Sequence, residues 1–272
     1  MPFRLLFAEN GYVHICGHRG NSMSAPENTL PALESARRHG ASACEIDIVL
    51  SRDGEIVLSH DELLDRTTDG KGPVGEHDLA GLKRLDAGAW FAPEFAGTRL
   101  PTLTETLELA STLGLGLVVE IKERRRVDET LPRLREVLEG TQALEDVVLL
   151  SFDHSSMLRV KECIPGVRTE IITHARHVDI LAVARAACAD SISIELDMLH
   201  AHDALALAGA GIGIRCHLPR PSWFERQEAY GLDPAGELVR ALRHGAITSV
   251  SGDDVSFLRE FLLVRGLPAP PV

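Results

Sequence analysis

Acids, histidines and basic residues cluster in six short motifs in the first half of the chain. Among their residues are two histidines, three separated carboxylates and two cations that could act together. These are the groups needed to cleave a phosphodiester on a hard metal ion, with side chains that move protons and others that neutralise phosphate charge. In chain order the motifs are His18-Arg19-Gly20, Pro26-Glu27-Asn28-Thr29, Glu45-Ile46-Asp47, His60-Asp61, Arg66-Thr67-Thr68-Asp69-Gly70 and Glu120-Ile121-Lys122.

Three of the carboxylates form a candidate metal site. Glu45 and Asp47 are two residues apart on a predicted strand, so their side chains lie on the same face. Two adjacent carboxylates repel each other unless a cation neutralises them. Glu120, at the end of the next predicted barrel strand, can supply a third. Oxygen ligands without His or Cys suit Mg²⁺ or Ca²⁺, with Mn²⁺ as a further option. The alternative is a cluster of salt bridges with nearby arginines.

His18 and His60 form a candidate acid–base pair. His18 follows the first predicted strand, and Asp53-Gly54 is a hairpin signal that, when folded, puts Asp47 opposite His60. Because histidine titrates near neutral pH, one imidazole can accept a proton while the other donates one. Either histidine can take either role.

Arg19 and Lys122 are the candidate phosphate-binding residues. Arginine presents a planar fork to two phosphate oxygens, and lysine a point charge. We expect Glu27 to orient Arg19 or His18 in preference to binding a metal, and we read Asn28 or Thr29 as the cap of the first predicted helix. The segment 66–68 is expected to brace a loop.

The elements that must position these residues alternate between short apolar runs and helical patterns, which is typical of a parallel sheet. The length of 272 residues matches the roughly 250 of a (β/α)8 barrel. We therefore predict one TIM-barrel domain over 1–272, with an insertion at about 51–101 whose apolar cluster is 88–95. The predicted strands are 13–17, 43–50, 117–121, 147–152, 169–173, 191–195, 212–216 and 246–250, and the predicted helices are 28–39, 102–112, 128–139, 154–163, 177–188, 201–209, 234–244 and 254–263.

The overall charge and the cysteines restrict the partners and the compartment. A net charge of −12 argues against nucleic acid or an anionic membrane as the main partner. The five cysteines form no C-x-x-C motif and read as reduced thiols. The N-terminal apolar run is too short for a signal peptide, and no run reaches the roughly 18 residues of a membrane span. We expect a cytoplasmic protein with a small-molecule substrate. The sequence does not indicate an oligomeric state.

The six motifs, in this order over about residues 15–122, resemble those of the glycerophosphodiester phosphodiesterase family. The resemblance implies a TIM barrel, a function in lipid metabolism and His18 and His60 as the catalytic pair. It also implies a metal-dependent hydrolase that converts a glycerophosphodiester to glycerol phosphate and an alcohol. Two alternatives stay open: a related barrel acting on a lipid head group, as a lysophospholipase D or phosphatidylinositol-type phosphodiesterase, and a barrel that binds a phosphoester without turnover.

The second half of the chain departs from the family pattern. Arg215 stands where the family usually has a tryptophan, and Ser251-Gly252 displaces its Thr-Asp pair. Strand alternation places Arg215 and His217 on one inward face, where the cation needs a partner. That partner is either a protein acid, with Glu195 as the best candidate, or a negative group on the substrate. Near it, Glu195, Asp197, His174, His200, His202 and His217 offer either an outer pocket for the leaving group or a second metal site.

Overall fold

The computed structural model describes residues 3–271, so residues 1, 2 and 272 of the predicted domain lie outside it. Eight parallel strands form a closed barrel in which β1 pairs with both β2 and β9. The predicted TIM barrel is confirmed. Its strands are β1 (His14–His18), β2 (Ala43–Leu50), β4 (Gly116–Ile121), β5 (Val147–Ser151), β6 (Arg168–Thr173), β7 (Ser191–Glu195), β8 (Gly213–His217) and β9 (Ser249–Gly252), and β3 (Ile56–Leu58) pairs antiparallel with β2.

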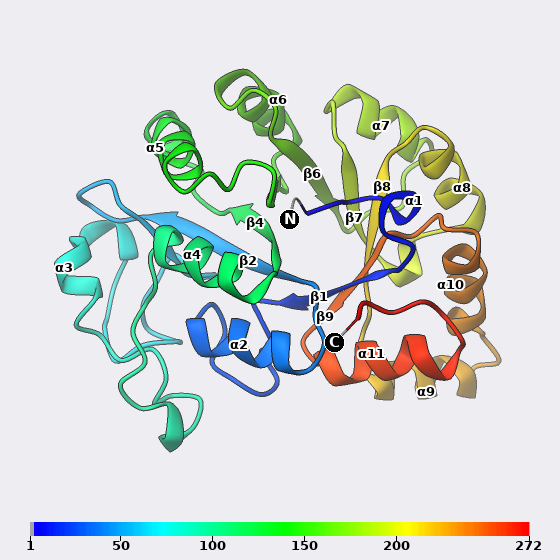
Figure 1. Cartoon of the computed structure of the whole chain (residues 1–272), viewed down its shortest axis with the longest axis horizontal. Coiled ribbons are helices and arrows are strands. Elements are labelled where there is room, and N and C mark those ends of the chain that lie inside the picture. Colours follow the sequence, from blue (N-terminus) through cyan, green and yellow to red (C-terminus); the bar gives the residue numbers. More distant parts are fainter. Residues whose placement is uncertain (1–2, 272) are drawn as a thin grey trace.

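Helices surround the barrel, as Figure 1 shows. Within residues 3–271, no helix is both long and apolar enough to cross a membrane. The α-helices are α1 (Phe7–Asn10), α2 (Leu30–Arg38), α3 (Leu79–Leu82), α4 (Leu103–Leu113), α5 (Val127–Gly140), α6 (His154–Cys163), α7 (Ile180–Ala186), α8 (Ala201–Gly209), α9 (Pro221–Ala229), α10 (Pro234–Arg243) and α11 (Val255–Val264), and the 3₁₀ turns are η1 (Val74–Glu76), η2 (Pro93–Phe95) and η3 (Leu196–Met198).

Side-chain caps define where several barrel helices begin. The carboxylates of Asp153, Asp179, Asp233 and Asp254 each accept a backbone N–H from the first turn of the helix that follows. Thr102 and the glutamate three residues later form a reciprocal capping box at the start of α4. These caps fix the points at which the chain leaves each barrel-mouth loop and turns back along the outside of the barrel.

Two differences from the predicted strand–helix alternation lie in the C-terminal part of the barrel. The last strand begins at Ser249, three residues later than predicted, because Ala246 and Ile247 are buried before the chain joins the sheet. Their apolar character reflects this burial and not strand pairing. The helix α9 was not predicted, because the strand–helix alternation calls for one helix between β8 and β9, whereas the chain forms both α9 and α10 there.

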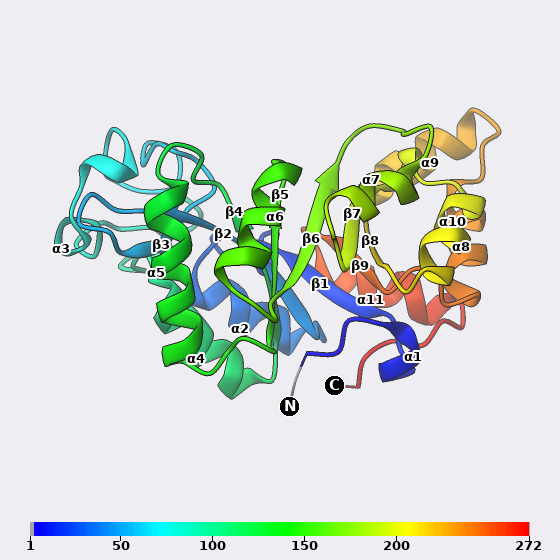
Figure 2. The same ribbon diagram turned by 90° about the horizontal axis from the view of Figure 1, so that it is seen from above.

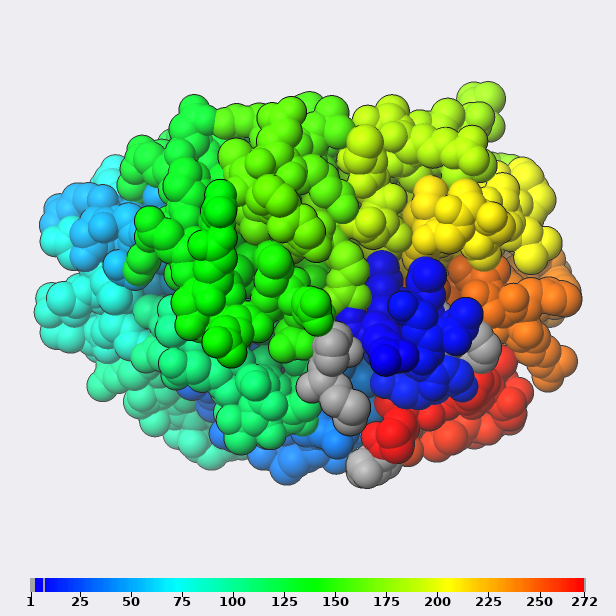
Figure 3. Space-filling view, turned by 45° about the horizontal axis from the view of Figure 1, so that its top comes forward, coloured from blue at the N-terminus to red at the C-terminus, as the bar shows by residue number. Residues whose placement is uncertain are grey.

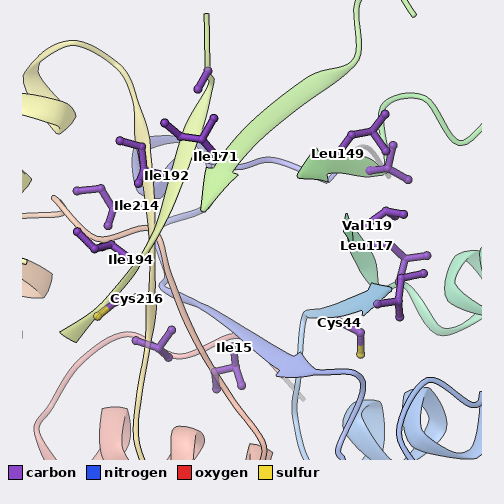
Figure 4. Close-up of a cluster of buried hydrophobic side chains, with 14 of the residues drawn as sticks. Ile15, Cys44, Leu117, Val119, Leu149, Ile171, Ile192, Ile194, Ile214 and Cys216 are labelled. Atoms are coloured by element: carbon purple, nitrogen blue, oxygen red, sulfur yellow. The ribbon is translucent and has the colours of Figure 1, made fainter. Parts of the chain in front are cut away.

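The main core lies between the barrel wall and its helices. Figure 4 shows the strand residues that face outward into this layer, among them Ile15 of β1, Leu149 of β5 and Ile214 of β8. All three are fully buried. Because neighbouring residues of a strand point to opposite faces, the intervening positions point into the barrel.

The N-terminal segment closes the bottom of the barrel. Phe3 and Leu5 pack against inward-facing residues of β1, β2, β4 and β5. A side chain at Gly116 would approach the Phe3 ring to 2.2 Å, so glycine is required there. The two ends of the described chain meet on this side, where the N–H of Val13 donates to the carbonyl of Pro268 at 2.9 Å. Figure 3 shows the blue and red segments in contact.

The segment between β2 and α4 forms a lobe beside the barrel, at the left of Figures 1 and 2. Its core contains Val57, Leu64, Val74, Leu82 and Leu100, packed on the end of β2. The apolar cluster predicted at 88–95 is not this core. The aromatic side chains of that stretch contact one another, but Trp90 is 40% exposed.

Candidate active site

A cavity of about 300 Å³ opens at the carboxyl ends of the barrel strands, where TIM barrels carry their active sites. Its lining combines residues of the N-terminal motifs with residues of the second half of the chain. The lining residues are His18, Arg19, Glu45, His60, Glu120, Lys122, Phe152, Ile172, Thr173, His174, Ser193, Ile194, Glu195, Arg215 and His217.

The three predicted metal ligands lie together beside this cavity. Asp47 of β2 is directly opposite Glu120 of β4 in the sheet, and Glu45 precedes Asp47 by two residues on the same face. One carboxylate oxygen from each residue lies within 4.8 Å of the other two, and all three residues are buried. Within residues 3–271 no other group of acids, histidines or cysteines meets this spacing, so the alternative second metal site near Glu195 is not formed there.

Both predicted phosphate-binding cations contact these acids. The Lys122 ammonium lies 2.8 Å from Glu120 Oε1 and 3.3 Å from Asp47 Oδ1. The Arg19 Nε lies 3.4 Å from Asp47 Oδ2, and this buried nitrogen has no hydrogen-bond partner. The backbone N–H of Arg19 donates to Glu45 Oε2 at 3.0 Å.

The acids outnumber the cations that contact them. Burial, followed by repulsion from Asp47, raises the pKa of Glu45 to about 7. Three carboxylates meet two cations here, so the negative charge of the cluster is not fully compensated by its contacts. A divalent cation bound by Glu45, Asp47 and Glu120 would relieve that charge, and the three oxygen donors fit a hard ion. The residues present therefore fit the expected metal.

Asn28 holds Asp47 in place. Its side-chain amide donates to Asp47 Oδ2 at 2.8 Å, and its carbonyl oxygen accepts the Asp47 backbone N–H at 3.0 Å. Of the two candidate caps, Thr29 occupies the cap position of α2, and the interpretation of Asn28 as the cap was wrong. Asn28 adopts a left-handed conformation with φ of 56°, which turns its side chain toward β2 instead of along the helix.

Each predicted catalytic histidine is held by a carboxylate. His60 Nδ1 lies 2.7 Å from Asp61 Oδ1, and His18 Nδ1 lies 2.8 Å from Asp253 Oδ1. The other ring nitrogen of His18 lies 3.9 Å from Glu45 Oε2, on the side of the acid cluster. Burial alone would lower the pKa of His18, but the hydrogen bond to Asp253 and the Glu45 carboxylate outweigh it and raise the pKa.

The hairpin that carries His60 has a different register from the predicted one. Ile48, Val49 and Leu50 pair with Leu58, Val57 and Ile56. Ser59, and not His60, therefore lies opposite Asp47, and its N–H donates to the Asp47 carbonyl at 3.1 Å. The reason is a three-residue turn closed by a bond from the Ser51 N–H to the Glu55 carbonyl, with Gly54 at φ of 85°. His60 still reaches the cavity, one residue beyond this pair.

Glu27 and Arg66 connect the loop that carries Arg19 with the loop that carries His60. The Arg66 guanidinium donates to Glu27 Oε2 at 2.7 Å and to Asp61 Oδ2 at 2.6 Å, and Arg19 donates to Glu27 Oε1 at 2.9 Å. Glu27 thus contacts Arg19 and not His18. The hydrogen bond from Arg66 lowers the pKa of Asp61 to about 2, so Asp61 is ionised where it holds His60.

Arg215 has a protein partner, but it is not Glu195. Its guanidinium donates to Glu170 Oε1 at 2.7 and 2.9 Å, and Ser191 donates to the other Glu170 oxygen. Glu195 instead lies 2.8 Å from His174. The predicted partner of Arg215 was chosen from the adjacent strand β7. In a TIM barrel, however, the inward-facing residues of alternate strands, here β6 and β8, share a layer. The charge of Arg215 is therefore balanced within the protein.

His217, which was expected in an outer pocket, lines the cavity and packs edge-on against His18, with ring centroids 5.2 Å apart. Burial lowers its pKa to about 4. Other residues of the cavity were missed from the sequence. Phe152, Thr173 and Ser193 complete the wall. Asp253 was missed because the last strand was placed too early. Its position directly after a barrel strand was the available signal.

Known proteins are similar to this chain in sequence and in fold. The chain is 36% identical over 159 residues to a glycerophosphodiester phosphodiesterase of Caldanaerobacter subterraneus subsp. tengcongensis, a match that covers 58% of this chain and 65% of that protein. A glycerophosphodiester phosphodiesterase of Bacillus altitudinis is 34% identical over 161 residues, covering 58% of this chain and 66% of its own length. The matched region thus spans slightly under two thirds of these curated relatives.

The solved structures extend the similarity to the whole barrel. A phosphodiesterase of Oleispira antarctica, solved with the product sn-glycerol-3-phosphate, superposes with a TM-score of 0.79 at 26% identity, covering 92% of this chain and 97% of that one. A glycerophosphodiester phosphodiesterase of Agrobacterium tumefaciens gives 0.73 at 26% identity, covering 90% and 97%. The sequence model of the glycerophosphoryl diester phosphodiesterase family matches residues 18–208. Since this match covers well over half of the chain, the chain belongs to the glycerophosphoryl diester phosphodiesterase family.

Proposed function

We propose that this protein hydrolyses a glycerophosphodiester to glycerol phosphate and an alcohol, with the help of a divalent cation. The observation that supports this most directly is the acid cluster of Glu45, Asp47 and Glu120, which lies next to two cations and one carboxylate-held histidine, His18. The relative solved with sn-glycerol-3-phosphate supports a product of the same kind here.

The cation would be held by the three carboxylates. A bound Mg²⁺ or Ca²⁺, or alternatively Mn²⁺, would neutralise charge that develops on the phosphoryl oxygens. The protein's own contribution is to keep the three oxygens together: Asn28 fixes Asp47 through two hydrogen bonds, and the Arg19 backbone fixes Glu45.

Arg19 and Lys122 would bind the phosphate from the protein side. Both already contact the acid cluster, so an arriving phosphodiester meets positive charge next to the site of the metal. The contacts of Lys122 with its two carboxylate partners hold its ammonium group at the cavity wall before the substrate binds. Such preorganised charge is worth more in a water-poor site than in bulk solvent.

His18 and His60 would transfer the protons. One removes a proton from the nucleophile, either water or the glycerol hydroxyl next to the phosphate, and the other protonates the leaving alkoxide. The second route passes through a cyclic phosphate and requires a vicinal hydroxyl on the substrate. The carboxylates on both Nδ1 atoms leave the opposite ring nitrogens for this task.

A panel of glycerophosphodiesters tests this function. Purified protein would be incubated with each diester, with added Mg²⁺, Mn²⁺ or Ca²⁺ or with chelator, and both products would be identified. We expect glycerol phosphate and the free alcohol in equal amounts, only with metal. A protein that binds the diesters but forms no product is instead a phosphoester-binding barrel.

One observation favours a second candidate, a lysophospholipase D acting on a diester with an acyl tail. An apolar pocket of about 190 Å³ shares His217 with the main cavity. Rates on lysophospholipids of increasing chain length test it, together with sedimentation on liposomes. A kcat/KM that does not rise with chain length argues against this candidate. The pocket is lined mainly by Met23, Leu218, Pro219, Pro221 and Phe257.

We place this activity in lipid metabolism in the cytoplasm. Five free cysteines, three of them buried, fit a reducing compartment. Fractionation of the source cells, with a disulfide-free control protein, tests the location.

A further inference from the structure

The family match ends at residue 208, but a group that contacts a candidate catalytic histidine comes from residue 253. Asp253 directly follows β9, in the half of the chain where the motifs depart from the family pattern. Its Oδ1 lies 2.8 Å from His18 Nδ1. The equivalent contact of His60, to Asp61 of its own motif, measures 2.7 Å. The two histidines are therefore held alike by carboxylates of different origin.

The contact determines which nitrogen of His18 carries a proton. An ionised carboxylate can only accept hydrogen bonds, so the proton lies on Nδ1 and the Nδ1–H group donates to Asp253. The hydrogen bond to His18 lowers the pKa of Asp253 to about 2, which keeps the carboxylate ionised. In the neutral imidazole, Nε2 is then the free nitrogen on the side of Glu45, where the substrate would react.

Backbone contacts between two loops keep Asp253 in place. The N–H of Met23 donates to the Asp253 carbonyl at 3.0 Å, and the N–H of Val255 donates to Asn21 Oδ1 at 3.3 Å. These bonds tie the loop after β9 to the loop that follows His18. The Asp253 side chain also lies 3.4 Å from the Ser22 hydroxyl. Its orientation is therefore set before a substrate arrives.

We propose that Asp253 is a positioning residue for His18, holding the imidazole with Nδ1 protonated and Nε2 directed at the reacting phosphate. This proposal rests on the proposed phosphodiesterase activity for its kinetic consequences, but not for its structural ones. Asp253 lines the neighbouring apolar pocket and not the main cavity, so its contact with the candidate catalytic groups is the one with His18. The C-terminal segment thus supplies a functional group although it lies outside the family match.

The test compares Asp253→Asn with Asp254→Asn. Both remove one negative charge from adjacent positions, but Asp254 accepts the Phe257 N–H at 3.1 Å as the cap of α11, a role that asparagine also fills. We expect Asp253→Asn to lower kcat at least about 10-fold. The loss should not exceed the one expected when an acid–base group is removed altogether, which is about 10²–10⁴-fold. KM should change little, and Asp254→Asn should behave as wild type.

A double variant separates positioning from general damage. Because Asp253 acts through His18, His18→Ala with Asp253→Asn should turn over at the rate of His18→Ala alone. If the two losses multiply, or if Asp254→Asn loses as much activity as Asp253→Asn, the proposal is overturned.

A measurement on wild-type protein avoids any dependence on folding of the variants or on turnover. Nitrogen NMR of ¹⁵N-histidine-labelled protein, with the His18 signals assigned from His18→Ala and the pH raised until the His18 ring is neutral, reports which ring nitrogen carries the proton. We expect Nδ1–H. An Nε2–H tautomer in the wild type contradicts the proposal even if the protein hydrolyses diesters. An Nδ1–H tautomer in a protein without diesterase activity removes the proposed function and leaves the positioning contact intact.

Discussion

At the scale of single residues, the two candidate catalytic histidines differ in what fixes their carboxylates. Asp61 is bound by Arg66, which also reaches Glu27. Asp253 is instead held by bonds between two loops. In both cases the histidine ring has one fixed nitrogen and one free one, which is the arrangement expected of proton-transfer groups.

Replacing either histidine by alanine should therefore lower kcat by about 10²–10⁴-fold, with a smaller effect on KM. The double variant should be little worse than either single one, because the pair acts as a unit. Steady-state rates on a glycerophosphodiester measure this. His202→Ala is the matched control, since the side chain of His202 is 78% exposed and lies outside the cavity. Near wild-type turnover in His18→Ala or His60→Ala removes that residue from the mechanism.

The Arg215–Glu170 pair gives a prediction about stability. Arg215 is 5% exposed and Glu170 1%, so Glu170→Gln leaves a buried guanidinium without its anion. We expect a loss of about 3–5 kcal/mol in the free energy of unfolding. Asp78→Asn, which breaks the exposed pair with Arg52, should leave the free energy of unfolding close to that of the wild type. Urea denaturation measures both, and equal small losses would show that Arg215 does not depend on Glu170.

The residues of the site were largely predictable, but their contacts were not. Residue types and strand periodicity placed Glu45, Asp47 and Glu120 on one edge of the sheet, as the structure has them. The partner of Arg215 depended on which strands share a layer of the closed barrel, and strand order along the chain does not give this. Asn28 was misread because its left-handed backbone cannot be read from residue type.

At the scale of elements, the turn between β2 and β3 shows how a short sequence signal can fix a hairpin but not its register. Asp53-Gly54 predicts a turn, and a turn is present. The glycine, however, takes the last position of a three-residue loop and not the second position of a two-residue one. A shift by one residue in a strand reverses the faces of its side chains, so a small error in the turn moved His60 away from its predicted partner.

The strand β1 carries a buried histidine that makes stability depend on pH. His14 is 2% exposed, and burial lowers its pKa to about 4. The unfolded chain therefore binds more protons than the folded one between pH 4 and about 6.5. The contribution of His14 to the free energy of unfolding is fully present above pH 6.5 and decreases as the pH falls. At pH 4 and below, about 3 kcal/mol of stability is lost through protonation of this residue.

Urea denaturation across this pH range tests the prediction. His14→Gln should flatten the dependence of the unfolding free energy on pH, although it also loses contacts to the Arg4 carbonyl and the Ser42 hydroxyl and is less stable at pH 7. His202→Gln, at an exposed position, should keep the wild-type slope. An unchanged slope in His14→Gln would mean that His14 does not contribute to the pH dependence.

At the scale of the whole molecule, the proposed reaction requires a chain with a net charge of −12 to bind an anionic phosphodiester. Its field opposes this approach, and the two cations of the site are already in contact with buried acids. The barrel places these charged side chains at the carboxyl ends of its strands. The eight strands predicted from the sequence were enough to locate the site at that end. What the sequence could not provide is the balance of charge there, because it depends on burial in the closed fold.

That balance makes the metal requirement the most direct test of the account. The protein would be stripped with EDTA, checked for residual metal by elemental analysis, and assayed on a glycerophosphodiester before and after addition of Mg²⁺, Mn²⁺ or Ca²⁺. We expect turnover to disappear on stripping and to return with at least one of these ions. Glu120→Gln should bind the ion more weakly, with Glu123→Gln, outside the acid cluster, as the control. Full turnover by protein without detectable metal would contradict the central claim.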